Sequence, residues 1–141
     1  MTTVAASTAR EVKIVGIISF AHALSHFYFL VLPPILPLLK EEFQVSYAAL
    51  GLLMTGYGLA AGIIQTPVGF IVDRLGGRPS LAFGLFAQAA CIALMGLATD
   101  YWQLLVLYVL AGMANTVYHP ADYVILTASI AKERLGRAFS V

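Results

Sequence analysis

The sequence predicts an all-α membrane protein, and its composition and charge pattern lead to this prediction. Of its 141 residues, 60% are hydrophobic and only 11% are charged, and the mean hydropathy is +0.88. Soluble domains are about 45–50% apolar and about 25% charged. The charges form short clusters separated by apolar runs of the length, roughly 20 residues, that a helix needs to cross a bilayer. We therefore expect a polytopic bundle of transmembrane helices in contact with the lipid bilayer.

Four spans follow a short tail at residues 1–11. They cover residues 12–39, 47–72, 79–98 and 102–130, and together make up one helical unit over residues 12–131. Prolines remove a helical N–H donor, so we expect the outer end of the first span to break at Pro33, Pro34 and Pro37. Ser46 is the expected N-cap of the second span. Residues 132–141 are expected to form a charged loop followed by the start of a fifth helix.

The basic residues predict the orientation in the cell membrane. If the N-terminal tail is cytoplasmic, the inner segments hold seven of the eight basic residues: Arg10, Lys13, Arg74, Arg78, Lys132, Arg134 and Arg137. The outer turns then hold only Lys40. Because Lys and Arg concentrate on the cytoplasmic side of membrane proteins, both ends of this chain are expected in the cytoplasm. Since these residues only flank apolar runs, no nucleic-acid partner is expected.

Small residues in the second span predict close helix packing. Gly58 and Gly62 are four residues apart. Small residues at this spacing let helix backbones approach each other in membranes. We therefore expect this pair to face a neighbouring helix.

All three histidines lie inside the predicted spans. His22 and His26 are four residues apart and share one face of the first helix. A polar stripe along the fourth span consists of Tyr108, Asn115, His119 and Asp122. A charged residue at a helix centre costs about 2.5–3.5 kcal/mol to insert, so such residues face a bundle interior or a watery cavity.

The fourth span also carries Pro120, which leaves the carbonyl of Thr116 without its helical donor and predicts a kink beside a wet cavity. His119 and Asp122 are three residues apart, so they are expected to share a proton and to titrate as a coupled pair. The candidate substrate and proton pathway is therefore made of His22, His26, Asn115, His119 and Asp122. The alternative for the histidines and for Asn115 is a structural hydrogen bond between helices.

Residues 69–81, "GFIVDRLGGRPSL", form the turn between the second and third spans. This turn resembles the signature loop of the major facilitator superfamily, G-x-x-x-D-R-x-G-x-R/K-R/K. The matching residues are Gly69, Asp73, Arg74, Gly76 and Arg78, and Pro79 stands where a second basic residue is often found. The resemblance implies that the loop latches the two halves of a transporter in the outward-open state. Physically, Gly76 and Gly77 permit a turn with positive φ, and Asp73, at a helix end, is expected to find a basic or helix N-terminal partner.

Two further stretches, "HALSHF" and "GMANTVYHPADY", resemble the branch of the superfamily that includes fosmidomycin-resistance efflux proteins. The fourth helix of the superfamily often carries an arginine, implicated in proton coupling, before a glycine. If Gly112 is that glycine, Tyr108 occupies the arginine position, and His119 with Asp122 becomes the candidate coupling pair.

Members of the superfamily have twelve helices in two related halves. The resemblance therefore implies that this chain is a fragment or a truncated gene product. It would hold the first four helices and the start of a fifth, and its missing C-terminal half would be a partner.

The predicted function is secondary active transport: proton-coupled export of a small organic compound or drug, driven by the proton gradient. The protein is then no enzyme, and we expect neither a cofactor nor a metal. One alternative is a four-helix membrane redox protein whose histidines ligate haem. The other is a small four-helix multidrug exporter acting as a dimer, although such exporters usually need a carboxylate in the first span, and residues 12–39 contain none.

Overall fold

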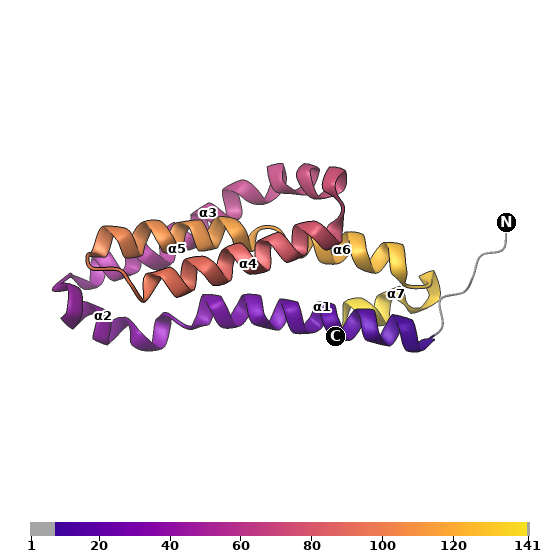
Figure 1. The fold of residues 1–141 in the computed structure, drawn as a ribbon, viewed down its shortest axis with the longest axis horizontal. Helices are drawn as coiled ribbons and strands as arrows, with labels where there is room; N and C mark the ends of the chain where they lie inside the picture. Colours follow the sequence, from indigo (N-terminus) through magenta and orange to yellow (C-terminus); the bar gives the residue numbers. More distant parts are fainter. Residues whose placement is uncertain (1–7, 141) are drawn as a thin grey trace.

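A computed structural model of the chain describes residues 8–140, and all regular elements among them are helical (Figure 1). In chain order these are α1 (Thr8–Leu30), the 3-10 helix η1 (Pro33–Ile35), α2 (Leu36–Phe43), α3 (Tyr47–Leu75), α4 (Gly77–Met95), α5 (Tyr101–Asn115), α6 (Tyr118–Ser129) and α7 (Lys132–Phe139). Four stretches are long and apolar enough to cross a membrane: Thr8–Phe43, Tyr47–Leu75, Gly77–Met95 and Tyr101–Ser129. The predicted all-α bundle with four spans is confirmed.

The spans run back and forth along one long axis (Figure 1). The start of α1, the turn between α3 and α4, and α7 lie at one end, and α2 and the turn between α4 and α5 lie at the other. Buried apolar side chains form two clusters. One includes Ile18, Val72 and Ile125, and the other includes Leu53 and Leu104. Both clusters hold the spans together inside the bundle.

The helix boundaries follow the predicted breakers and caps. After α1 ends at Leu30, Pro33 opens the 3-10 helix and Pro37 lies in the first turn of α2. The Ser46 hydroxyl accepts a hydrogen bond from the Ala49 N–H at 3.2 Å and caps α3. Both expectations are confirmed.

The fourth span is broken rather than continuous. Helix α5 ends at Asn115 and α6 begins at Tyr118. Pro120 therefore lies in the first turn of α6, where a backbone N–H has no helical acceptor in any case. The Thr116 hydroxyl turns back to donate to the Met113 carbonyl at 2.7 Å. The kink expected from Pro120 is confirmed, and it lies three to four residues before the proline.

Close helix packing depends on a different glycine from the predicted pair. A Cβ built on Gly58 or on Gly62 would meet no atom of the described residues within 4 Å, so the close packing expected at these two glycines stays a prediction. A Cβ on Gly112 would lie 2.5 Å from the carbonyl oxygen of Tyr57. Helices α3 and α5 thus touch backbone to backbone at Gly112.

The segment after the fourth span is a helix and not the expected charged loop. Helix α7 has charged residues on one side, while Leu135 and Ala138, three residues apart, pack against the cluster that includes Ile18 and Val72. Apolar residues at helical spacing gain stability by covering such a cluster, which is why this charged segment folds back onto the bundle.

Candidate functional site

A cavity of about 590 Å³ lies between α1, α6 and α7. Its polar lining consists of Ser19, His22, His26, His119, Asp122 and Ser140. Four of the five residues predicted for the substrate and proton pathway therefore meet in one place, although they come from spans about a hundred residues apart in the chain.

The centre of this site is a contact between α1 and α6. The Nδ1 atom of His22 lies 2.8 Å from the Oδ2 atom of Asp122. Asp122 is only 8% exposed. The hydrogen-bond partner of Asp122 is therefore His22, and the coupled titration of His119 with Asp122 stays a prediction. The His119 ring instead contacts the His22 ring edge to face, with the ring centroids 5.2 Å apart.

A second histidine extends the contact toward the open side of the cavity. The Nε2 atoms of His22 and His26 are 3.1 Å apart. His26 is exposed, whereas His22 is half-buried. Asp122, His22 and His26 therefore form a hydrogen-bonded row that runs from a buried carboxylate to an exposed imidazole.

The row constrains where protons are placed. An ionised carboxylate only accepts hydrogen bonds, so His22 donates from Nδ1 to Asp122. When His22 is neutral, its Nε2 accepts from the Nε2–H of His26, and when His22 is protonated, its Nε2 donates to a neutral His26. A single proton can thus move between the two imidazoles without a change in the positions of the rings.

One of the two carboxylate oxygens of Asp122 makes no hydrogen bond to the described residues. Asp122 Oδ1 is buried and has no hydrogen-bond partner among the described residues, and the same holds for the hydroxyl of Tyr118, one helical turn earlier. Buried polar atoms are nearly always paired, so an exception calls for an explanation. Asp122 thus holds His22 with one carboxylate oxygen, while the other has no partner among the described residues.

The remaining members of the predicted polar stripe do not reach the cavity. Tyr108 is fully buried, and its hydroxyl donates to the carbonyl oxygen of Phe29 at 2.9 Å. Asn115, the last residue of α5, is half-buried and does not line the cavity. Tyr108 and Asn115 belong to α5, whereas His119 and Asp122 belong to α6, so the stripe predicted on one helix is divided between two.

The signature loop between α3 and α4 has the expected turn. Gly76 has φ +91°, in the region that favours glycine. Gly77 instead begins α4, where a Cβ would lie 2.8 Å from the carbonyl oxygen of Ala121. Asp73 is exposed, and none of the ion pairs found in residues 8–140 includes it, so the partner expected for this carboxylate is not among the described residues.

No pattern in the sequence indicated two features of the site. Ala138 and Phe139 at the end of α7, with Ser140 directly after it, line the cavity, and Glu11 forms an ion pair with Arg134 of α7. Both depend on the folding back of α7, which no pattern within a single helix indicates.

The helix bundle and its site define a class of protein before any comparison is made. Several spans with their few ionisable groups gathered at a cavity form the arrangement of a membrane transporter. The profile of the Major Facilitator Superfamily matches residues 18–141, and the chain belongs to this superfamily. The resemblance seen in the signature loop is confirmed, and the protein is a multi-pass membrane protein of a transporter family.

Relatives of known name are similar to the chain at modest identity. The chain is 29% identical over 119 residues to the fosmidomycin resistance protein of Escherichia coli (strain K12), a match that covers 82% of this chain and 29% of the relative. It is 32% identical over 116 residues to the multidrug resistance protein MdtH of Citrobacter koseri, covering 76% of this chain and 28% of that protein. The chain thus spans less than a third of the length of these relatives. No solved structure matches it.

These findings set the two alternative functions aside. A bis-histidine haem needs its imidazoles on opposite faces of the porphyrin. The His22 and His119 rings contact each other edge to face, with their centroids 5.2 Å apart, and are not arranged as a facing pair of haem ligands in this structure. Because the chain belongs to a family of transporters, its membership favours secondary transport over the redox protein and over the small four-helix exporter. Among residues 8–140, no group of three or more His, Cys, Asp or Glu side chains is placed to hold a metal ion.

Proposed function

We propose that the complete protein exports a small organic compound in exchange for protons, and that His22 and Asp122 carry the proton. The observation that supports this most is the 2.8 Å contact between His22 Nδ1 and Asp122 Oδ2, which joins two spans at the wall of a cavity. Intramembrane carboxylate and histidine groups are the usual elements of proton relays in transporters. The names of the relatives, a fosmidomycin resistance protein and multidrug resistance proteins, support export as the direction.

In this proposal protonation controls how tightly α1 is held to α6. With Asp122 ionised, the His22–Asp122 hydrogen bond is charge-assisted whether or not His22 is protonated, and such bonds contribute about 1.5–3 kcal/mol. Protonating Asp122 removes the negative charge and weakens the contact. A proton that arrives at His26 can pass to His22, and from there to the carboxylate, so that α1 and α6 separate in one protonation state only.

The proposal includes an orientation and partners. Both ends of this chain face the cytoplasm, as the basic residues predict. The second wall of the cavity comes from the C-terminal half of the complete transporter, as transporters place their site between related halves. The signature loop around Asp73 and Arg74 latches the halves together.

The test uses full-length protein in proteoliposomes, with radiolabelled fosmidomycin as the first probe because a relative carries its name. Wild-type protein should accumulate the probe when the lumen is acidic. Asp122→Asn should lose this gradient-driven accumulation and keep the exchange of labelled for unlabelled probe, because the amide cannot carry the proton. Asp100→Asn is the matched control, because Asp100 caps α5 far from the cavity and asparagine caps as well.

Two results would count against the proposal. Gradient-driven accumulation by Asp122→Asn at the wild-type rate would reduce the His22–Asp122 contact to a structural hydrogen bond. Wild-type accumulation of the probe that does not respond to the pH gradient would remove proton coupling altogether.

A further inference from the structure

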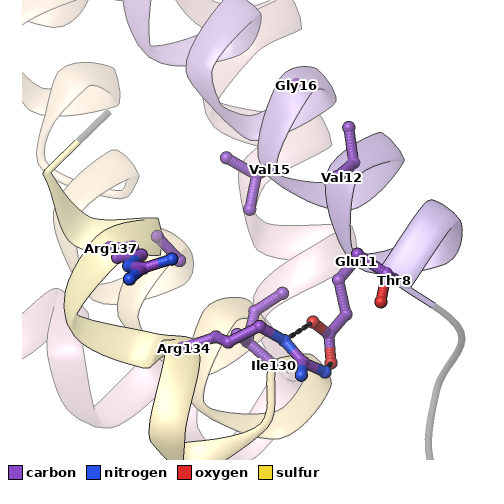
Figure 2. Close-up of a pocket in the computed structure, with 9 residues that line it drawn as sticks. Thr8, Glu11, Val12, Val15, Gly16, Ile130, Arg134 and Arg137 are labelled. Carbon is purple, nitrogen blue, oxygen red and sulfur yellow. Dashed lines mark hydrogen bonds and ion pairs between the residues drawn. The ribbon is translucent and has the colours of Figure 1, made fainter.

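A buried carboxylate holds the start of α1 to α7 at the end of the bundle that carries the chain's N-terminus. Glu11 is only 5% exposed and accepts three hydrogen bonds. Two come from the Arg134 guanidinium, from Nε at 2.6 Å and from Nη2 at 2.8 Å, and the third comes from the Ala131 N–H at 3.2 Å. Figure 2 shows Arg134 reaching across from α7 to Glu11, while Arg137 lies apart from this pair.

The two hydrogen bonds between Arg134 and Glu11 fix the geometry of this contact. A guanidinium donates two parallel hydrogen bonds to a carboxylate, which fixes the orientation of both groups in a way that a single point charge does not. The third bond comes from the backbone at Ala131, directly before α7 begins at Lys132. Glu11 therefore fixes both the position of α7 and the angle at which it leaves α6.

Besides Glu11, the packing of Leu135 and Ala138 on the bundle holds helix α7 in place. Ile130 and Ala131, which join it to α6, are both extended, with ψ values of 140° and 141°. The Ile130 N–H still donates to the Leu126 carbonyl and the Arg134 N–H to the Ala131 carbonyl, each at 2.9 Å, but the helical hydrogen bonds do not run through from α6 into α7. The Glu11–Arg134 pair thus holds a helix that is joined to the bundle through a hinge.

The other end of α7 lies at the cavity. Ala138, Phe139 and Ser140 line it together with His22 and Asp122. The Phe139 ring stacks on Tyr123 of α6, with the ring centroids 5.7 Å apart. A tilt of α7 about the hinge would lift these residues from the cavity.

We propose that the Glu11–Arg134 ion pair is a latch that holds α7 over the cavity and so controls access to the His22–Asp122 site from that end of the bundle. This inference rests on the proposed function only in treating the cavity as the transport site. Glu11 and Arg134 are positioning residues, since neither touches the His22–Asp122 pair.

The test measures access to the cavity directly. A cysteine is introduced at Ala23, which lines the cavity on α1, in full-length protein whose own Cys91 is replaced by serine. Labelling by a membrane-impermeant maleimide is followed in inside-out vesicles. Glu11→Gln and Arg134→Gln should each speed labelling several-fold. The exchange of charges, Glu11→Arg with Arg134→Glu, should slow it again toward the wild-type rate.

Two further variants separate the latch from a general loss of structure. Arg137→Gln removes a charge one turn further along α7 that has no ion pair with Glu11 among the described residues, and it should label as the wild type does. Arg134→Lys keeps the charge but loses the paired hydrogen bonds, and should label at an intermediate rate. An unfolded α7 would not produce such a graded series.

Labelling at the wild-type rate in both Glu11→Gln and Arg134→Gln would overturn the latch, as would a charge exchange that fails to restore slow labelling. The measurement needs neither substrate nor a proton gradient. A failure of Asp122→Asn to uncouple transport would therefore leave this test intact, and the two proposals can fail separately.

Discussion

The contact between α3 and α5 at Gly112 gives the sharpest prediction about the fold that builds the site. In Gly112→Ala, the new Cβ would lie 2.5 Å from the Tyr57 carbonyl oxygen and 3.0 Å from the Tyr57 Cα. Ordinary contact begins at 3.4 Å, so the two backbones must move apart by about 0.9 Å. Both contacting atoms belong to the backbone of a long helix, and no flexible side chain can absorb the shift.

The size of the effect follows from two opposing terms. Overpacking of this kind lowers the free energy of unfolding by about 1–3 kcal/mol. Replacing glycine with alanine within a helix raises it by up to about 1 kcal/mol. We expect a net loss of roughly 1–2 kcal/mol in the free energy of unfolding. The midpoint of thermal unfolding of the full-length protein in detergent should fall accordingly.

Gly62→Ala in α3 is the matched control. Its Cβ would meet no atom within 4 Å, so only the gain in helix propensity applies. This variant should unfold at or above the wild-type temperature. If Gly112→Ala proves as stable as Gly62→Ala, then α3 and α5 do not touch at Tyr57 and the packing described above is incorrect.

Two other predictions concern a buried hydroxyl and the orientation in the membrane. Tyr108→Phe removes the hydrogen bond to the Phe29 carbonyl oxygen and should lower the free energy of unfolding by about 0.5–1.5 kcal/mol, seen as a lower unfolding midpoint. Tyr123→Phe, at an exposed position, should leave the unfolding midpoint unchanged. Equal midpoints for the two variants would contradict this role of the Tyr108 hydroxyl. Cysteines introduced at Leu75 and Thr99, at opposite ends of α4, should react with an impermeant maleimide from opposite sides of the membrane. Reaction of the cysteine at Leu75 from outside intact cells would refute the cytoplasmic placement of the signature loop.

The sequence predicted those features that a single helix or turn determines. Span lengths, the prolines after α1, the Ser46 cap and the signature loop follow from local chemistry, and the structure and the family match bear them out. Composition also showed that the polar residues inside the spans had to face a cavity, and His22, His26, His119 and Asp122 do.

Contacts between helices could not be predicted in the same way. His119 and Asp122 share α6, and their spacing alone made them a pair, but the fold places the Asp122 carboxylate against His22 of α1. Which glycine meets a neighbouring backbone likewise depends on the relative rotation of α3 and α5, and periodicity within α3 does not indicate the contact at Gly112 of α5. The Glu11–Arg134 pair joins residues 123 positions apart in the chain, and neither residue carries a local signal.

The most direct test of the central claim compares two histidine variants in the gradient-driven transport assay. If the proton moves through the contact between α1 and α6, His22→Gln should abolish accumulation, because the partner of Asp122 is lost. His119→Gln should retain it, because His119 touches only the edge of the His22 ring. Loss of accumulation in His119→Gln together with normal accumulation in His22→Gln would contradict the account.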